Sequence, residues 1–370
     1  MSKSVLVVVR GLGNNGISNF VINTYTKLKQ SGDFDIDILT LTKNNPSEMV
    51  ESLKKSGISV LTVDTFRKRP LQHMVTINKI LKRDYSVVHF HIDNWVNFYP
   101  IYKASLITNL KVIVQSHNSR SVKIESSKLK LMVHNIVKKL SSKWHIKRCA
   151  VSEEAAVWLF GPKNDAKVIN NPVDVKRFSF SPKKRSAIRE KYGIQQDDDL
   201  YGNIARLDYQ KNPIFLLKVF NEIKKKNKHA KLMLVGNGIL ENEVKKFIYE
   251  NGLENFVNIV NWTDEVADYY SAIDEIIFPS FYEGMPLSLV EAQCSGTSVL
   301  YSDVITDRIR VNKNVESCSL NKDVSYWASK AISLEKKNKG IGREDCFIPF
   351  LNTSFDYNFY IEKLIDFYFA

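Results

Sequence analysis

The chain has 370 residues, of which 44% are hydrophobic and 25% charged, and its formal net charge is +13. This length allows two domains of ordinary size, each with its own core, and the composition excludes a disordered chain. The apolar runs are too short to span a membrane, no cleavage pattern follows Met1, and the four cysteines show no paired spacing. We therefore expect a cytoplasmic protein without disulfides, whose basic excess favours phosphate-rich partners.

Strand-length apolar runs alternate with helical or polar segments through the first half of the chain. The first run, Ser4–Arg10, leads into a glycine-rich turn and a helical segment at 17–30. Further strand-like runs lie at Asp35–Leu41, Ile58–Val63, Val87–His91 and Val112–Ser116. Buried runs separated by helices predict a parallel sheet with helices on both faces.

The glycine-rich turn, Gly11-Leu-Gly13-Asn-Asn-Gly16, has the spacing of a dinucleotide-binding fingerprint. Asp33, Asp35 and Asp37 follow about twenty residues later, where such folds hold a ribose. These features leave a nicotinamide-dependent oxidoreductase open as an alternative. The spacing is weak evidence, because any loop whose backbone approaches a phosphate or sugar favours glycine there.

Three histidines lie in or directly after predicted strands. His89 and His91 share one face of a strand, a spacing compatible with a metal, but no third ligand at a usual spacing accompanies them. We expect His89 to pack in the core and His91 to lie in a cleft. His117 follows the run that ends at Ser116, and open parallel sheets bind ligands at the carboxyl ends of their strands. His117 is therefore the candidate site residue of the first half, with a packed histidine as the alternative.

The segment 120–148 carries nine Lys or Arg residues against one Glu. Its apolar residues recur at helical spacing, which predicts a helix with one apolar and one cationic face: Leu129, Met132, Val133, Ile136, Leu140 and Trp144. One interpretation is a helix that packs on its own domain and leaves a solvated charged face. The other is a peripheral contact with an anionic membrane, which further basic residues at 66–69 and 81–83 also favour.

The strand and helix alternation restarts after the turn at Asn171-Pro-Val-Asp174, which places a domain junction near residues 170–180. Two similar domains are therefore predicted. The strand-like runs of the second half are Leu200–Ala205, Lys231–Val235, Val257–Val260, Glu275–Phe278 and Ser298–Tyr301.

Arg206 and Lys211 lie five residues apart where the chain passes from a strand into a helix. A guanidinium grips phosphate oxygens bidentately and an ammonium adds a point charge, so the pair can neutralise a diphosphate without a metal. The alternative is a pair of solvated surface cations. The acids at 33–35 and 197–199 have the spacing of Asp-x-Asp metal motifs, but we interpret them as loop acids and expect no metal site.

Two acids, Glu283 and Glu291, lie eight residues apart around a loop-to-helix junction that is otherwise almost wholly apolar. Gly284-Met-Pro-Leu-Ser288 fits a turn with Pro286 at the first helical position, so the following backbone N–H groups would offer a phosphate site. Glu291 lies in an uncharged helical segment, where an acid is costly unless something polar meets it. The alternative is a loop acid near the helix dipole and a lone exposed helix acid.

The segment 279–296, P-S-x-x-E-G-x-P-x-x-x-x-E-A-x-x-x-G, resembles the C-terminal signature of the retaining glycosyltransferases of family 4. The segments 168–174 and 203–213 resemble the linker and the cationic motif of this family. The resemblance implies an α/β protein of GT-B fold, in which the parallel sheets of two Rossmann-like domains face each other across a cleft. It implies an acceptor-side domain at 1–172, a nucleotide-sugar domain at 173–354, and a C-terminal helix at 355–370 that packs back onto the first domain.

The resemblance also implies roles for individual residues. Glu283 would lie beside the donor sugar, Glu291 would bind the nucleotide ribose, and His117 would contact the donor sugar. The implied catalytic residues are Glu283, His117, Arg206 and Lys211, of which the two cations would stabilise the leaving diphosphate. The implied donor-binding residues are Gly16, Arg206, Lys211, Gly236, Thr263, Glu283, Gly284, Met285, Leu287, Ser288 and Glu291.

The predicted activity is retaining, metal-independent hexosyl transfer from a nucleotide sugar, expected to be a UDP-sugar, without a cofactor. The sequence looks like bacterial capsular and exopolysaccharide glycosyltransferases, which implies a polyprenyl-diphosphate-linked saccharide acceptor and association with the cytoplasmic face of a membrane. The alternatives are a GT-B sugar-nucleotide epimerase and an oxidoreductase that uses Gly11–Gly16. Nucleic acid is not an expected partner, because the basic segments lack interleaved aromatic motifs.

Overall fold

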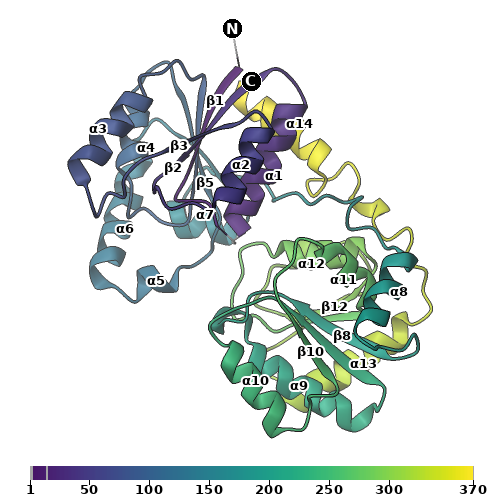
Figure 1. The fold of residues 1–370 in the computed structure, drawn as a ribbon. Coiled ribbons are helices and arrows are strands. Elements are labelled where there is room, and N and C mark those ends of the chain that lie inside the picture. The colour runs from purple at the N-terminus through teal and green to yellow at the C-terminus, as the bar shows by residue number, and fades with distance from the viewer. Residues whose placement is uncertain (1–2, 14–15, 370) are drawn as a thin grey trace. The chain divides into compact units, whose positions relative to one another are not determined.

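A computed structural model describes residues 3–13 and 16–369, except for the side chains of Val122 and Lys123. Asn14 and Asn15 of the glycine-rich turn therefore lie outside the described residues. The chain divides into two compact units, one reaching Asn171 and joined by the segment from Tyr357 onward, the other Pro172–Asp356. Each unit has one parallel sheet with helices on both faces (Figure 1). The predicted α/β class with two parallel sheets is confirmed.

The first unit contains a seven-stranded sheet in the order β3-β2-β1-β4-β5-β6-β7. Its strands are β1 (Lys3–Val9), β2 (Phe34–Thr40), β3 (Ser59–Thr62), β4 (Val87–Ile92), β5 (Lys111–Ser116), β6 (Lys147–Ala150) and β7 (Lys167–Val168). Its helices are α1 (Gly16–Gln30), α2 (Ser47–Lys55), α3 (Pro70–Ile80), α4 (Tyr99–Ser105), α5 (Val122–Glu125), α6 (Lys128–Leu140), α7 (Glu153–Phe160) and α14 (Tyr357–Phe369), with a 3-10 turn η1 (Ser141–Lys143).

The second unit contains a six-stranded sheet in the order β10-β9-β8-β11-β12-β13. Its strands are β8 (Asp199–Ile204), β9 (Ala230–Val235), β10 (Val257–Val260), β11 (Glu275–Phe278), β12 (Ser298–Ser302) and β13 (Val315–Cys318). Its helices are α8 (Pro182–Lys191), α9 (Pro213–Lys226), α10 (Glu241–Glu250), α11 (Val266–Ala272), α12 (Leu287–Cys294) and α13 (Val324–Asn338), with 3-10 turns η2 (Tyr209–Lys211), η3 (Asp307–Ile309) and η4 (Ile348–Phe350).

The last helix, α14, packs beside α1 in the first unit, although more than three hundred residues separate them in sequence (Figure 1). Tyr360, Ile361, Leu364 and Tyr368 lie on the buried side of α14. They share a hydrophobic core with α1 and with the buried valines of β1. Removing this apolar surface from water stabilises the helix in its place, at roughly 25 cal/mol per Å².

Helix α6 covers only the middle of the basic segment 120–148, and four of the six residues of its predicted apolar stripe are exposed. Leu129 is 66% exposed, Met132 52%, Ile136 49% and Leu140 52%. The helix instead buries His134, whose ring stacks on Trp158 at 4.5 Å, and Val137. The helix therefore packs on its own domain through His134, Val137 and the partly buried Val133, whereas four residues of the predicted apolar face are exposed. No helix within the described ranges is both long and apolar enough to cross a bilayer.

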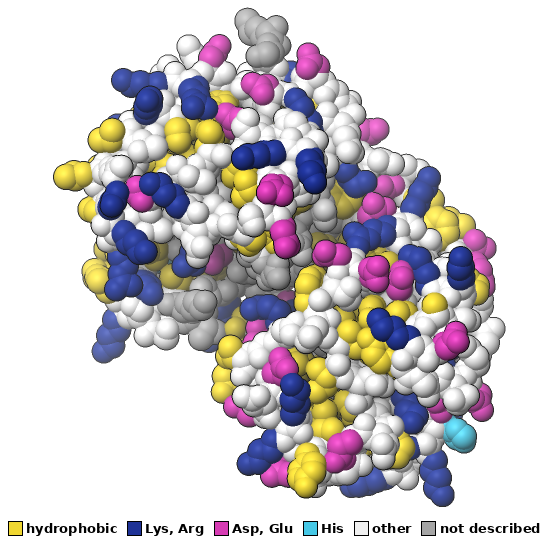
Figure 2. Space-filling model, in the orientation of Figure 1, with side chains coloured by type: hydrophobic (Ala, Val, Ile, Leu, Met, Phe, Trp, Pro, Cys, Tyr) yellow, Lys and Arg dark blue, Asp and Glu magenta, His cyan; other side chains and the backbone are white. Residues whose placement is uncertain are grey.

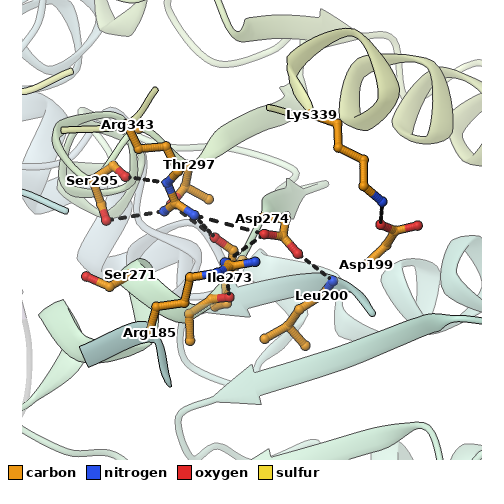
Figure 3. A network of polar contacts seen from close by, with 12 residues as sticks. Arg185, Asp199, Leu200, Ser271, Ile273, Asp274, Ser295, Thr297, Lys339 and Arg343 are labelled. Carbon is orange, nitrogen blue, oxygen red and sulfur yellow. Dashed lines mark hydrogen bonds and ion pairs between the residues drawn. The ribbon is translucent and has the colours of Figure 1, made fainter. Parts of the chain in front are cut away.

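A network of ion pairs and hydrogen bonds lies near the start of β11 in the second unit (Figure 3). The carboxylate of Asp274 forms ion pairs with Arg185 and Arg189 at 2.8 and 2.6 Å. The guanidinium of Arg343 donates to the backbone oxygens of Ile273, Tyr270 and Ser295. Because Arg343 comes from the segment after α13, these bonds hold that segment against the sheet before the chain returns to the first unit.

Candidate active site

The candidate residues of the second unit lie in loops at the carboxyl edge of its sheet. Arg206 and Lys211 follow β8, Glu283 follows β11, and these two strands are neighbours. Parallel strands deliver their following loops to the same edge, so the cations and the acid are brought close together. Asn212, at the start of α9, has a left-handed backbone with φ 54°. Its side chain donates a hydrogen bond to the carbonyl of Pro279, which connects the loop after β8 to the loop after β11.

Lys211 and Glu283 form an ion pair, with 2.6 Å between Lys211 Nζ and Glu283 Oε1. Their side chains are 15% and 8% exposed, so the pair is largely removed from water. Gln210 adds bonds to Glu283 Oε2 and to the carbonyl of Tyr282, at 3.3 and 2.9 Å. The two loops are thereby fixed to each other, and the charge of Lys211 is balanced by a carboxylate.

Arg206 is more open to solvent. Its side chain is 57% exposed and pairs with Asp208 at 3.0 Å. The carboxylate of Asp208 also accepts the backbone N–H of Lys211, which caps η2. Arg206 can therefore turn toward a ligand at little cost, because a surface ion pair contributes only about 0–1 kcal/mol.

Gly236 lies after β9, and its role visible in the structure is close packing against the cationic loop. Its φ is +143°, and a Cβ at this position would lie 2.1 Å from the carbonyl oxygen of Ala205. Any side chain would push the loop after β9 away from the loop that carries Arg206. Thr263 lies after β10, where its hydroxyl accepts the backbone N–H of Glu265 at 3.2 Å.

Helix α12 begins one residue later than predicted, because Pro286 is its N-cap and Leu287 its first residue. The first turn contains no acidic residue, and Pro286 provides no side-chain cap. Gly284 and the buried Met285 form the approach to this terminus. The partly buried Leu287 and Ser288 carry the first backbone N–H groups, so the positive end of the helix dipole is available to an anion.

Glu291 lies on α12 and receives a hydrogen bond from the hydroxyl of Tyr270, at 3.1 Å. Burial raises the pKa of Glu291 to about 7, while the Tyr270 hydrogen bond and the charge of Arg177 oppose that rise. We expected a polar partner for Glu291 from the sequence, and that partner is Tyr270 on α11. A carboxylate with one oxygen already engaged can still accept from a ligand hydroxyl.

The two candidates of the first unit lie at the carboxyl edge of its own sheet. Gly16 is the exposed first residue of α1, and His117 follows β5 with 7% of its surface exposed. The expectation that His91 lies in a cleft is wrong, since only 2% of its surface is exposed. Its side chain points into the core between β4 and α1, where it hydrogen-bonds to Tyr25.

Several residues that shape the site were not singled out from sequence. Gln210 and Asp208 lie within the cationic segment 203–213. Asp208 directly precedes the short turn η2, and because Asp is a preferred N-cap residue, its capping role could have been predicted from the sequence. Tyr270 lies 21 positions before Glu291, and a separation of this length does not predict a contact between two residues. Within the described ranges, no group of three His, Cys, Asp or Glu side chains is arranged to hold a metal ion.

Known proteins resemble this chain in sequence and in fold. Residues 184–339 match the family model described as glycosyl transferases group 1. The putative glycosyltransferase EpsF of Bacillus subtilis is 29% identical, over 88% of this chain and 86% of its own. The capsular polysaccharide biosynthesis glycosyltransferase CapH of Staphylococcus aureus is 24% identical over 98% of both.

Two further similarities concern a named substrate and a solved fold. An Escherichia coli UDP-Gal:alpha-D-GlcNAc-diphosphoundecaprenol alpha-1,3-galactosyltransferase is 22% identical over 75% of this chain and 74% of its own. The crystal structure of Anabaena HepE with UDP and glucose superposes with a TM-score of 0.77, at 14% identity over 99% of both chains. None of these proteins is named as an epimerase or an oxidoreductase, so the two enzyme alternatives gain no support. The chain is thus a glycosyltransferase of GT-B fold with a group 1 domain, and it resembles the bacterial capsular and exopolysaccharide glycosyltransferases.

Proposed function

We propose that the protein transfers a hexosyl group from a UDP-sugar to a lipid-linked saccharide, with retention of anomeric configuration and without a metal ion. The observation that carries the proposal is the convergence of Lys211, Glu283 and the start of α12 at one edge of the second sheet. Two cations and a helix N-terminus supply the charge that a departing diphosphate needs. The E. coli relative named for UDP-Gal and the HepE complex with UDP support a uridine nucleotide.

In the proposed complex, Arg206, Lys211 and the first N–H groups of α12 hold the diphosphate. Glu291 accepts hydrogen bonds from the ribose hydroxyls, and Glu283 meets the sugar. Because Lys211 also pairs with Glu283, a donor phosphate that binds this ammonium competes with the carboxylate. Glu283 is then released to accept from sugar hydroxyls, which links binding of the phosphates to binding of the sugar.

The proposed transfer needs no protein base. The acceptor oxygen forms its bond to the anomeric carbon as the bond from that carbon to the diphosphate breaks. The acceptor proton passes to the leaving phosphate oxygen on the same face of the sugar, which gives retention. The protein contributes the cations that stabilise the charge on the leaving group.

We propose that the acceptor is a saccharide on a polyprenyl diphosphate, and that the protein meets it at the cytoplasmic face of a membrane. The E. coli relative, named for a GlcNAc-diphosphoundecaprenol acceptor, supports this acceptor class. The exposed stripe of α6 supports the membrane contact, because four large apolar side chains face water beside exposed lysines. Figure 2 shows Lys and Arg side chains spread over the part of the first unit where Figure 1 places α3, α4 and α6.

The experiment that tests the proposed activity follows UDP-sugars by NMR, with and without EDTA. Incubation with a synthetic GlcNAc-diphosphopolyprenol should release UDP and form a glycoside with the anomeric configuration of the donor, at the same rate in EDTA. An inverted product would overturn retention, and loss of turnover in EDTA that added Mg²⁺ restores would overturn metal independence. Turnover to a free epimerised sugar would overturn transfer itself.

A further inference from the structure

An unbroken chain of hydrogen bonds runs through the first unit from the C-terminal helix to His117. The hydroxyls of Tyr368 and Tyr25 lie 2.8 Å apart, and Tyr25 lies 2.8 Å from Nε2 of His91. Nδ1 of His91 lies 2.9 Å from Nε2 of His117. His89 joins the same chain, with its Nδ1 2.7 Å from Tyr368 and 2.9 Å from Tyr25. We refer to these five residues as the histidine–tyrosine chain.

The members of this chain come from four separate parts of the fold. Tyr368 lies on α14 and Tyr25 on α1, helices that pack side by side on the sheet (Figure 1). His89 and His91 lie on β4, and His117 follows β5. The ring of Phe20 packs against His91 and His117, with centroids 5.6 and 5.2 Å away, and limits their rotation.

All five side chains are buried, so bulk water does not compete for these hydrogen bonds. Burial lowers the pKa of His89 and of His117 to about 3, and that of His91 well below its usual range. Each imidazole is therefore neutral near pH 7 and carries one N–H.

This hydrogen count leaves His91 and its two neighbours, Tyr25 and His117, only two arrangements. Both ring nitrogens of His91 are engaged, so one must donate and the other accept. If Nδ1 of His91 donates to His117, Tyr25 donates to Nε2, and His117 carries its hydrogen on Nδ1. If every bond runs in the opposite direction, His117 donates to His91 and its Nδ1 is an acceptor.

The environment of His89 at the far end favours the first direction. In that direction Nδ1 of His89 donates to the tyrosines, and its Nε2 accepts the thiol hydrogen of Cys149, whose sulfur lies 3.9 Å away. Burial raises the pKa of Cys149, which keeps the thiol protonated. The opposite direction would either aim a buried imidazole N–H at sulfur, a weak acceptor, or leave the hydrogen of one buried tyrosine hydroxyl without an acceptor.

We propose that Tyr25 and Tyr368 are positioning residues that hold His117 in the tautomer with its hydrogen on Nδ1. Among the described residues Nδ1 of His117 has no hydrogen-bond partner, so this N–H is available to a ligand at the carboxyl edge of the first sheet. The ligand part of this inference rests on the proposed function, whereas the tautomer itself does not. The C-terminal helix thereby fixes the chemistry of a site residue in addition to packing on the core.

The test observes the tautomer directly in the full-length protein. Protein labelled with ¹⁵N-histidine gives long-range ¹H–¹⁵N spectra that distinguish Nδ1–H from Nε2–H, and His117→Gln assigns the signals. We expect Nδ1–H for His117 in the wild type and a mixture of tautomers in Tyr25→Phe and Tyr368→Phe. The matched control is Tyr360→Phe, which removes a hydroxyl from the same buried side of α14 but from outside the chain.

A wild-type His117 with its hydrogen on Nε2 would overturn the inference, as would an unchanged tautomer in both folded chain variants. If Tyr25→Phe does not fold, the tautomer of His117 in the wild type and in Tyr368→Phe still tests the inference. For UDP-sugar turnover, Tyr25→Phe should lower kcat about tenfold with UDP affinity unchanged, a smaller loss than removal of a whole transition-state donor. The predicted tautomers without any turnover would refute the proposed function alone.

Discussion

Nζ of Lys211 lies 2.6 Å from a carboxylate oxygen of Glu283, and the two residues come from loops that follow the neighbouring strands β8 and β11. In the proposed complex, a donor diphosphate and Glu283 would therefore compete for the same ammonium. Removing Glu283 leaves Lys211 free for phosphate, whereas removing Lys211 leaves a mostly buried carboxylate without its cation. The two substitutions must have different consequences.

Glu283→Gln should reduce kcat about 100-fold, because in the proposed transfer the carboxylate acts on the sugar. The Kd for UDP should stay the same or become lower, since Lys211 loses its competitor. Calorimetric titration of UDP and steady-state kinetics separate these effects. Glu265→Gln, at an exposed acid after β10, is the control and should change neither. Loss of UDP affinity equal to the loss of kcat would contradict the division of roles.

Binding of a UDP-sugar should strengthen as pH rises from 6 to 8. The pKa of Glu291 is raised to about 7, and only the ionised carboxylate can accept from both ribose hydroxyls. The ionised fraction of Glu291 rises about tenfold over this range, which bounds the gain in affinity. UDP-glucose is the suitable ligand, because its diphosphate has no group that titrates there.

The pH dependence should disappear in Glu291→Gln, with affinity fixed at a low value. Tyr270→Phe removes a hydrogen bond that lowers the pKa of Glu291, so its binding curve should shift to higher pH. An unchanged pH dependence in Glu291→Gln would assign the titration to another group.

Glu275 should make the second unit less stable at alkaline pH. Its carboxyl group is fully buried at the start of β11 with both oxygens unpartnered, and burial and the charges of Glu335, Glu316 and Asp274 raise its pKa. When the pKa of a group is higher in the folded state than in the unfolded state, its contribution to stability is fully present below the unfolded-state pKa. This contribution is lost as pH rises through the folded-state pKa.

Urea unfolding of the wild type should therefore show a falling midpoint from pH 6 to pH 9, and Glu275→Gln should reduce that fall. Glu254→Gln, at an exposed acid before β10, is the control and should leave it unchanged. Equal slopes for Glu275→Gln and the wild type would show that Glu275 is not the titrating group.

The apolar stripe of α6 should bind anionic membranes. Met132→Asp with Ile136→Asp should abolish sedimentation with phosphatidylglycerol vesicles, since both side chains are about half exposed and their loss creates no cavity. Lys128→Glu with Lys139→Glu should weaken binding in a salt-dependent way. Lys138 is less suitable, because its ammonium lies over the ring of Trp158.

The matched control is Tyr249→Asp with Tyr326→Asp, which places the same charges at exposed positions of the second unit. Vesicle binding by the α6 variants at the wild-type level would refute the membrane contact.

The sequence predicted the central strands well because they are buried on both faces and read as continuous apolar runs. It missed β6 and β13, which are short and include Lys147, Arg148 and Glu316. Helical periodicity in α6 showed an apolar stripe but could not show which side packs, because His134 and Trp158 supply the burial from residues 24 apart. The Lys211–Glu283 pair and the histidine–tyrosine chain join positions 72 and up to 343 apart, which no local pattern encodes.

The central claim, that this edge of the second sheet binds the diphosphate of a sugar nucleotide, is tested most directly by titrating UDP into the wild type, Arg206→Ala and Lys211→Ala. The account predicts saturable binding by the wild type and about tenfold weaker binding in each variant, as expected for the loss of one charge-assisted contact. Absence of UDP binding by the folded wild type, or equal affinity in all three proteins, would contradict it.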